Sequence, residues 1–279
     1  RIGSVTKVFT STLLVTLRDK GVVRLDDPVA GLLPDRVRWP RDPRGAAHIT
    51  LRHLATHSSG LPRNPVNMAG VPGDPWNGYS EDRLYAGLAD TRLTFPTGAS
   101  STYSNLGIGL LGHALGQAAG SGYEAALMSH VIRPMGLTAT HLTLNDTERA
   151  LLATPYAAQD TTRRAKDWDL GCLAPAGGLS SSVTDLARFL AINLQARRAD
   201  SKPIPGGSLT ELHTPQRIAS DWSRGTGLAW LIGHDKDLGE VVWHNGGLAG
   251  FRSWVGFSPE WKLGAIVLTN CGRSVDEIG

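Results

Sequence analysis

The chain opens with RIGSVTKVFT (residues 1–10), in which Ser4 and Lys7 stand three positions apart. Apolar residues recur at near-helical spacing to about Arg18, and Gly21 follows, so we expect a helix that begins at or near Ser4. Because residues i and i+3 of a helix share a face, the hydroxyl and the amine can meet. A serine hydroxyl needs a base beside it, and a lysine serves as one when burial lowers its pKa. The alternative is an N-cap serine followed by a solvated lysine, and this motif alone does not decide.

A second stretch, Tyr103-Ser104-Asn105, opens a predicted helix over residues 104–118. A phenol near two amines can lose its proton and carry it between a nucleophile and a leaving group. The amide of Asn105 can hold a substrate carbonyl and steady the lysine. The sequence is equally consistent with Ser104 or Asn105 capping the helix while Tyr103 packs against its first turn.

The third stretch, VVWHNGGLAGF (residues 241–251), places His244, Asn245, Gly246 and Gly247 at the end of an apolar strand. Small residues at a strand edge let a substrate backbone lie against it, and the N–H of Gly247 can then face a developing oxyanion. Asn-Gly is also the strongest short signal for a hairpin turn. Taken alone, the stretch favours the turn.

Periodicity predicts helices in the middle of the chain and short strands towards its end. The helices are expected at residues 51–55, 80–89, 104–118, 123–132 and 182–196. Ser182 and Asp185 begin the last of these in an arrangement like a capping box, with Asp in place of Glu. Runs rich in Val, Ile, Trp and Phe predict an antiparallel meander over residues 226–233, 239–246, 251–258 and 262–270.

The composition excludes several classes of protein. The 279 residues, 41% hydrophobic and 19% charged, can bury the core of one large domain or of two lobes that share an interface. The formal net charge is +3 and Lys and Arg gather into no more than pairs, so we expect no nucleic-acid partner. Apolar stretches are interrupted every few residues, so we expect no membrane span. Cys172 and Cys271 lack a metal-type spacing, and the sequence leaves open whether they pair.

Nine histidines raise the question of a metal site, and His53 and His57 stand four apart. The glutamate of a His-Glu-x-x-His site is absent, and His57 falls in a Ser-Ser-Gly loop after the short helix has ended. We therefore expect neither a metal nor a cofactor. Trp76, in a loop rich in Gly and Pro, is the tryptophan best placed to form a wall for a substrate.

The order of these stretches resembles a known family. Ser-x-x-Lys on a helix, then Tyr-x-Asn, then His-x-Gly on a strand resembles the motif set of the penicillin-recognising serine enzymes, most closely the branch of class C β-lactamases, DD-peptidases and related esterases. Five segments match in order, namely IGSVTKVFT, LATHSSGLP, YSNLGIGLLG, APAGGLSSSVTDLARFL and HNGGLAGFRS. Because they extend over nearly the whole chain, the resemblance is specific.

The resemblance implies an α+β fold, in which an antiparallel sheet flanked by helices and an all-helical lobe enclose the active site. Residues 1–279 would form a single catalytic domain, with residues 25–215 as the mainly helical lobe and residues 1–24 and 216–279 as the sheet lobe. In the family, strands that precede the nucleophile helix also belong to the sheet, and here only three residues precede Ser4. We therefore expect a sheet lobe that is incomplete at both ends and is completed by a missing N-terminal segment or by a neighbouring chain.

The resemblance also implies roles for individual residues. The catalytic residues would be Ser4, Lys7, Tyr103 and His244, and the substrate-binding residues Asn105, Asn245, Gly246, Gly247 and Trp76. Ser4 would be the acylated nucleophile, Lys7 its base and Tyr103 the proton shuttle. The N–H groups of Ser4 and Gly247 would form the oxyanion hole.

One departure from the family pattern bears on the substrate. The third motif of β-lactamases usually begins with lysine, whereas this chain has His244, and an imidazole suits the carboxylate of a penicillin less well than an ammonium does. We therefore expect a serine acyl-transfer enzyme whose substrate is a small molecule or peptide carrying an acyl group, and which hydrolyses D-amino-acid peptides or esters. Three alternatives stay open: a peptide cyclase or thioesterase of the penicillin-binding-protein type, a β-lactamase, and a catalytically silent ligand-binding module.

Overall fold

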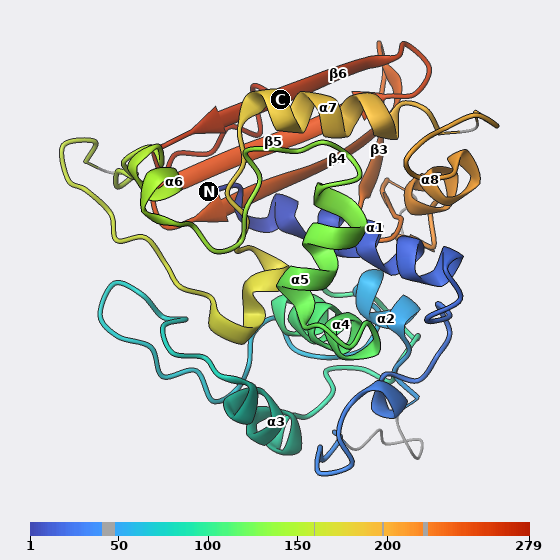
Figure 1. The fold of residues 1–279 in the computed structure, drawn as a ribbon, viewed down its shortest axis with the longest axis vertical. Helices are drawn as coiled ribbons and strands as arrows, with labels where there is room; N and C mark the ends of the chain where they lie inside the picture. Colours follow the sequence, from blue (N-terminus) through green and yellow to red (C-terminus); the bar gives the residue numbers. More distant parts are fainter. Residues whose placement is uncertain (41–47, 159, 197, 220–222) are drawn as a thin grey trace.

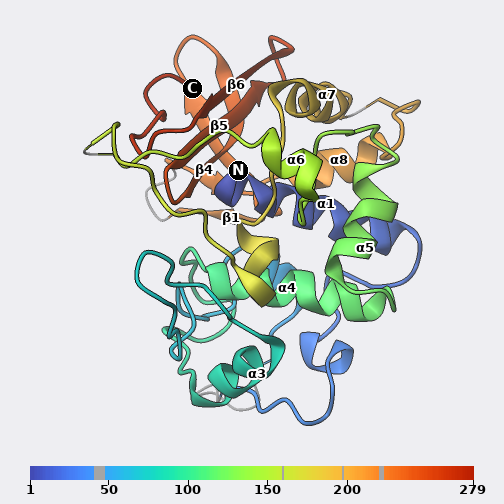
Figure 2. The same ribbon diagram turned by 60° about the vertical axis from the view of Figure 1, so that its left-hand side comes forward.

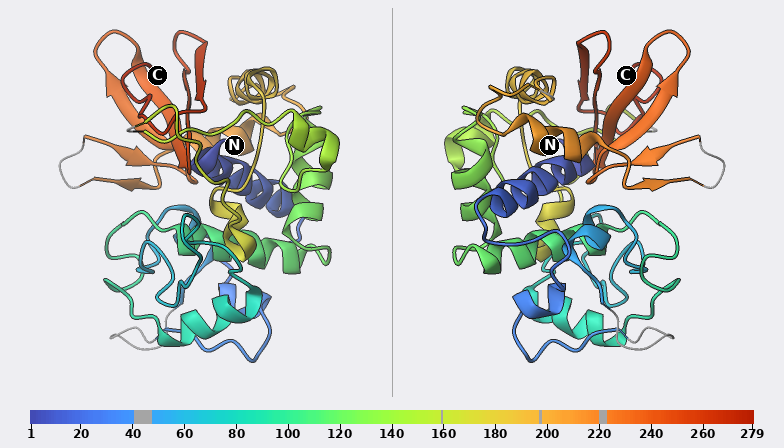
Figure 3. Two further views of the ribbon diagram at one scale, coloured as in Figure 1. Left: turned by 90° about the vertical axis from the view of Figure 1, so that its left-hand side faces the viewer. Right: turned by 90° about the vertical axis from the view of Figure 1, so that its right-hand side faces the viewer.

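The fold places an antiparallel sheet at one end of the molecule and a lobe of helices and loops at the other (Figures 1 and 3). The structure is a computed structural model that describes residues 1–40, 48–158, 160–196, 198–219 and 223–279. Helix α1 (Thr6–Asp19) runs between the two ends, with the sheet above it and α4 (Asn105–Ala118) below it in Figure 2. This is the α+β architecture that the sequence predicts.

The remaining helices are mostly short. They are α2 (Leu51–Ala55), α3 (Glu81–Asp90), α5 (Tyr123–Leu127), α6 (Asp146–Ala150), α7 (Val183–Asn193) and α8 (Gly206–His213), with 3₁₀ segments at Gly3–Val5, Val29–Leu32 and Gly171–Ala176 and a π-type turn at Met128–Ile132. The helices expected from periodicity are confirmed, and serines cap three of them. The side chains of Ser80, Ser104 and Ser182 each accept the backbone N–H three residues on.

The capping box expected at the start of α7 is only half formed. Ser182 accepts the N–H of Asp185 at 3.2 Å, as a cap should. The carboxylate of Asp185, however, accepts the N–H of Ala139 and the hydroxyl of Thr140, both at 2.7 Å, and does not return to the N-cap backbone. The shorter side chain of Asp thus ties α7 to the preceding loop, so the expectation of a reciprocal box is wrong.

The sheet is a meander in which each strand pairs with the next, antiparallel. Its strands are β1 (Arg217–Ile218), β2 (Gly225–Thr226), β3 (Leu231–Asp235), β4 (Gly239–Leu248), β5 (Phe251–Ser258) and β6 (Leu263–Thr269). The single strand expected over residues 226–233 is wrong, because the chain turns between β2 and β3. The N–H groups of Leu228 and Ala229 bond to Leu212 and Ala55 outside the sheet, and Ala229 has a φ of 65°.

The stretch that reads as an Asn-Gly turn is strand. Asn245 and Gly246 lie within β4 and pair with Trp254 and Ser253 of β5. The chain reverses instead after Leu248, which pairs with Phe251, and both of these side chains are buried. Carrying the strand on to this apolar pair buries both side chains at the end of the hairpin, and the turn interpretation of Asn245-Gly246 is therefore wrong.

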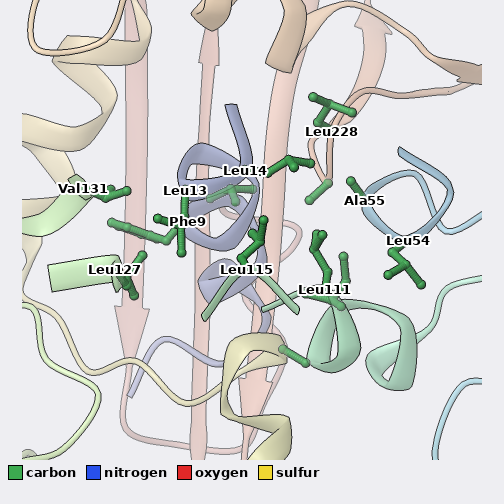
Figure 4. Close-up of a cluster of buried hydrophobic side chains, with 14 of the residues drawn as sticks. Phe9, Leu13, Leu14, Leu54, Ala55, Leu111, Leu115, Leu127, Val131 and Leu228 are labelled. Atoms are coloured by element: carbon green, nitrogen blue, oxygen red, sulfur yellow. The ribbon is translucent and has the colours of Figure 1, made fainter. Parts of the chain in front are cut away.

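Helix α1 is the centre of the hydrophobic core. Its side chains Phe9, Leu13 and Leu14 are fully buried. Figure 4 shows them among residues of neighbouring elements, which include Leu54, Ala55, Leu111, Leu115, Leu127, Val131 and Leu228. Burying a side chain of this size contributes about 1.5–3 kcal/mol. The start of α1, where Ser4 lies, is thus fixed by the packing on which both ends of the molecule depend.

Helix α7 lies against the sheet. The sequence places residues 25–215 in a mainly helical lobe, but α7 packs against β5 and β6 and lies beside the sheet (Figures 1 and 3). The buried face of α7 carries Leu186, Phe189 and Leu190. Phe189 stacks on Phe9 of α1, so this face packs into the same core as α1. Residues 183–193 thus pack with the sheet, although they lie within the stretch expected to be mainly helical.

The two cysteines do not pair. Cys172 and Cys271 are both free, and the sulfur of Cys172 lies 3.7 Å from Nδ1 of His113. Burial raises the pKa of the Cys172 thiol to about 12. Within the described ranges, no helix has the length and apolar character needed to cross a membrane.

Candidate active site

Ser4 and Lys7 meet at the start of α1. Ser4 lies in the 3₁₀ turn Gly3–Val5, and no side chain caps either this turn or α1, so the N-cap interpretation of Ser4 is wrong. Lys7 is fully buried, which excludes the solvated lysine. Its Nζ lies 3.1 Å from Oγ of Ser4, 2.9 Å from Oδ1 of Asn105 and 2.5 Å from the carbonyl oxygen of Ala176.

The surroundings of Lys7 favour the neutral amine. Burial, and then the positive charge of Arg63, hold the pKa of Lys7 well below its usual value. A neutral amine has two N–H groups and one lone pair. The oxygens of Asn105 and Ala176 only accept hydrogen bonds and can take both N–H groups, which leaves the lone pair for the hydroxyl of Ser4.

The Tyr103-Ser104-Asn105 stretch serves two purposes at once. Ser104 caps α4 by accepting the N–H of Gly107 at 2.8 Å, which leaves Asn105 free to reach Lys7. The ring of Tyr103 lies with its centroid 4.8 Å from Nζ of Lys7. Burial raises the pKa of Tyr103 to about 12, although a hydrogen bond with Ser4 lowers it in part. At neutral pH the phenol therefore keeps its proton and can donate it.

Strand β4 brings His244 to the same place. His244 is fully buried, its ring centroid lies 6.3 Å from that of Tyr103, and its Nδ1 lies 2.6 Å from the carbonyl oxygen of Asn245. Burial lowers the pKa of His244 to about 3, so the imidazole is neutral. Because a carbonyl only accepts, this hydrogen bond assigns the ring proton to Nδ1.

The side chain of Asn245 does not join the site. Its Nδ2 donates to Oδ1 of Asp276 at 2.9 Å. Successive side chains of a strand point to opposite faces of the sheet, so His244 and Asn245 cannot both face the nucleophile. The side chain of Asn245 therefore lies on the face of β4 opposite His244, as strand alternation indicates.

The glycines of β4 allow the strand to touch the nucleophile turn. A Cβ on Gly246 would overlap the carbonyl oxygen of Ile2 and lie 3.0 Å from the nitrogen of Ser4. A Cβ on Gly3, whose φ is 50°, would lie 2.7 Å from the nitrogen of Gly247. Backbone therefore lies directly against backbone, and Ser4 and Gly247 both line one cavity.

This cavity has a volume of about 370 Å³, within the range of small-molecule sites. Trp76 lies in its wall, as expected, and so does Asn105. Other lining residues carried no signal in the sequence, and they are Arg63, Asn64, Met68, Pro75, Trp168, Leu170, Leu173, Ala176, Gly177 and Leu248. Lys7, Tyr103 and His244 are not among the lining residues.

His57 is a further residue at the site that sequence reasoning assigned no role. It follows α2 with a φ of 57°, and its ring lies 4.6 Å from that of Tyr103. Its Nδ1 accepts the N–H of Ser104 at 3.2 Å. His57 therefore holds the backbone next to Tyr103, and the signal for it was the LATHSSGLP segment. Within the described residues, no three His, Cys, Asp or Glu side chains gather as they would around a metal ion.

The buried carboxylate of Asp74 joins the two loops that carry Trp76 and Trp168. It accepts the N–H of Trp76 at 3.2 Å and that of Asp169 at 3.0 Å. Nε1 of Trp168 donates to the carbonyl oxygen of Gly73 at 2.6 Å. One side chain thus holds both tryptophans in the cavity wall.

Replacing Asp74 by alanine is expected to lower the free energy of unfolding by about 1–3 kcal/mol, because the buried N–H of Trp76 and the partly buried N–H of Asp169 lose their acceptor. The Michaelis constant should rise more than kcat falls, since the wall moves while Ser4 and Lys7 stay in place. Urea unfolding and steady-state kinetics test this, with Asp82→Ala, whose side chain is 90% exposed, as the control. Equal stability of the two variants would contradict the role of Asp74.

Comparisons with known proteins agree with this geometry. The sequence matches the β-lactamase family over residues 1–278. It is 29% identical to "Beta-lactamase-like protein 4" of Dictyostelium discoideum over 95% of this chain and 49% of that protein. It is also 29% identical to the D-alanyl-D-alanine-carboxypeptidase/endopeptidase AmpH of Escherichia coli (strain K12), over 96% of this chain and 70% of that protein. The chain thus spans about half the length of the first of these relatives.

Among solved structures, a class C β-lactamase from Rhodobacter sphaeroides superposes with a TM-score of 0.80 at 23% identity, covering 98% of this chain and 80% of that one. The helical lobe, the antiparallel sheet and the site between them are therefore the class C β-lactamase fold. The chain belongs to the β-lactamase family of serine hydrolases.

Proposed function

We propose that this protein forms an acyl-enzyme on Ser4 and hydrolyses peptides of D-amino acids or esters. The observation that carries the proposal is the state of Lys7, which is fully buried and lies 3.1 Å from the Ser4 hydroxyl. No carboxylate in the described part of the chain pairs with it. Burying an amine without a counter-ion costs stability, and here its effect is to make a base for Ser4.

Acylation follows from these contacts. Neutral Lys7 takes the proton of Ser4 as Oγ attacks the substrate carbonyl, and the N–H groups of Ser4 and Gly247 stabilise the negative charge on the carbonyl oxygen. The phenol of Tyr103 donates a proton to the leaving group and receives the one that Lys7 took. Asn105 holds the amine in place through its 2.9 Å contact.

Hydrolysis of the acyl-enzyme uses the same groups in reverse. Water enters where the leaving group was, gives its proton through Tyr103 and Lys7, and attacks the acyl carbonyl. Ser4 leaves with a proton, which restores the starting state. Ser4 lines a cavity of about 370 Å³, so the space that the leaving group vacates can hold the attacking water.

The neutral imidazole of His244 lacks the charge that the lysine of the third motif of β-lactamases carries, so a substrate carboxylate would have to pair with another group of the cavity. With its pKa lowered to about 3, His244 carries no charge that could attract the carboxylate of a penicillin at neutral pH. The relatedness to a D-alanyl-D-alanine carboxypeptidase supports peptides that end in D-amino acids as substrates. We therefore rank peptides and esters above β-lactams.

Covalent labelling tests the proposal. A neutral fluorophosphonate should add one equivalent of mass to the tryptic peptide Ile2–Lys7, and Ser4→Ala should take up none. Turnover is then compared on D-Ala-D-Ala peptides, p-nitrophenyl esters, nitrocefin and one peptidyl thioester. We expect linear acid from the thioester and slower turnover of nitrocefin than of esters or peptides. A folded chain that takes up no label would instead be a ligand-binding module, and a macrocyclic product would indicate a cyclase.

A further inference from the structure

Arg63 is the one charged residue among the fourteen described residues that line the cavity beside Ser4. No acidic side chain lines it to balance this charge. The other lining side chains are apolar, aromatic, amide or hydroxyl groups, so a substrate entering the cavity meets a single formal charge, and that charge is positive.

The backbone of Arg63 is fixed while its guanidinium is left free. The carbonyl oxygen of Arg63 accepts the N–H groups of Asn105 at 2.8 Å and of Leu106 at 3.3 Å, which anchors it at the start of α4. The guanidinium lies over the ring of Tyr103, 5.0 Å from its centroid. The side chain is thus held beside the group that we assign as the proton shuttle.

No hydrogen bond or ion pair joins this guanidinium to another residue of the described chain. Other arginines form ion pairs, such as Arg1 with Asp167 at 2.7 Å and Arg52 with Asp26 at 2.8 Å. A guanidinium offers five N–H donors in a planar fork that matches a carboxylate. In Arg63 these donors face the cavity without an acceptor.

We propose that Arg63 determines the specificity of the site, and that the acyl substrate carries a carboxylate which pairs with the Arg63 guanidinium. This inference rests on the proposed acyl transfer at Ser4 and names the class of its substrate. None of the other nearby basic groups is placed for this part. Arg252 lies beside Gly247, but it does not line this cavity and its Nη1 donates to the carbonyl oxygens of Ala249 and Phe251. Lys7 is buried and committed to Ser4, Asn105 and Ala176, and His244 is buried and donates to the backbone.

The charge of Arg63 also acts on Lys7. The groups near Lys7 are Ser4, Asn105, the carbonyl oxygen of Ala176, the ring of Tyr103 and the imidazoles of His57 and His244, whose pKa values burial lowers. Arg63 supplies the nearby positive charge. A like charge disfavours the ammonium form, so removing it should raise the pKa of Lys7. The acid limb of the pH–rate profile, which requires neutral Lys7, should then move to higher pH.

The experiment compares esters that differ only in one charge. The first pair is p-nitrophenyl hemiadipate and its methyl ester, which place the carboxylate in the acyl part. The second is 3-carboxyphenyl acetate and its methyl ester, which place it in the leaving group. The wild type should prefer the anionic member of at least one pair by about tenfold in kcat/KM, and added salt should reduce this preference.

Three variants test whether the preference for the anionic ester depends on Arg63. Arg63→Gln should abolish the preference for the anionic ester, mainly by raising its KM, and should move the acid limb of the pH–rate profile to higher pH. Arg63→Lys should retain part of the preference and leave the acid limb where it is in the wild type. The matched control is Arg36→Gln, because Arg36 lies over Tyr85 at 5.3 Å but outside the cavity, and this variant should behave as wild type. The inference is overturned if neither anionic ester is preferred, or if Arg63→Gln keeps the preference and the acid limb of wild type.

Labelling by the neutral fluorophosphonate separates this inference from the proposed function. If wild type and Arg63→Gln both label at Ser4, the chemistry is present and the ester pairs alone decide the role of Arg63. If the folded wild type does not label, the proposed function fails and this inference fails with it.

Discussion

Replacing Lys7 by methionine is expected to lower kcat for ester hydrolysis by about 10²- to 10⁴-fold, the range that a general base contributes. Methionine has nearly the same length as lysine and no charge, so the buried space stays filled while the base disappears. Ser4 remains in its turn, but its hydroxyl has no neighbouring lone pair to take its proton. Stopped-flow acylation by p-nitrophenyl acetate and fluorophosphonate labelling measure the loss directly.

The same variant should remain folded. The acceptors of Asn105 and Ala176 lose their donors, which costs about 1–3 kcal/mol, but the protein no longer buries an amine, and this offsets the loss. The matched control is Lys20→Met, at the exposed C-terminal end of the same helix, which should keep full activity. Should a folded Lys7→Met chain acylate at the wild-type rate, Lys7 is not the base.

The sequence predicted most of the elements that hold the site. The Ser4–Lys7 spacing, the serine caps and the meander of apolar strands are local patterns, and each has its expected place in the structure except the strand expected over residues 226–233. Helix α8 was missed because its Gly-Gly-Ser start has low helix propensity. Its burial of Leu209 and Leu212 outweighs that propensity, and a local pattern does not show which faces will be covered.

The electrostatic state of the site could not be predicted from spacing. Whether Lys7 is neutral depends on burial by α1, α4 and the 3₁₀ segment Gly171–Ala176, three elements far apart along the chain. The same holds for His244, which looks like an ordinary imidazole in the sequence and is neutral in the fold. Arg63 was overlooked because a single arginine in a loop has no signature until the cavity around it is formed.

Gly246→Ala is expected to lower kcat/KM by about 10²- to 10³-fold, comparable to the loss of one oxyanion donor. The new methyl group would overlap the carbonyl oxygen of Ile2 and Oγ of Ser253 and would lie 3.0 Å from the nitrogen of Ser4. Two of these three atoms are backbone, which cannot turn aside as a flexible side chain can. Strand β4 and the nucleophile turn must therefore separate, and the N–H groups of Ser4 and Gly247 no longer converge on one point.

Overpacking of this kind costs about 1–3 kcal/mol of stability, so unfolding by urea is measured beside the kinetics. The matched control is Gly233→Ala in β3 of the same sheet, where a Cβ meets only Nε1 of Trp243, at 3.9 Å. The control carries the same loss of backbone freedom without the overlap, and it should keep both activity and stability. If Gly246→Ala retained turnover within twofold of that control, the close contact between β4 and the Ser4 turn would not shape the oxyanion site, because the methyl group cannot be accommodated there without moving one of them.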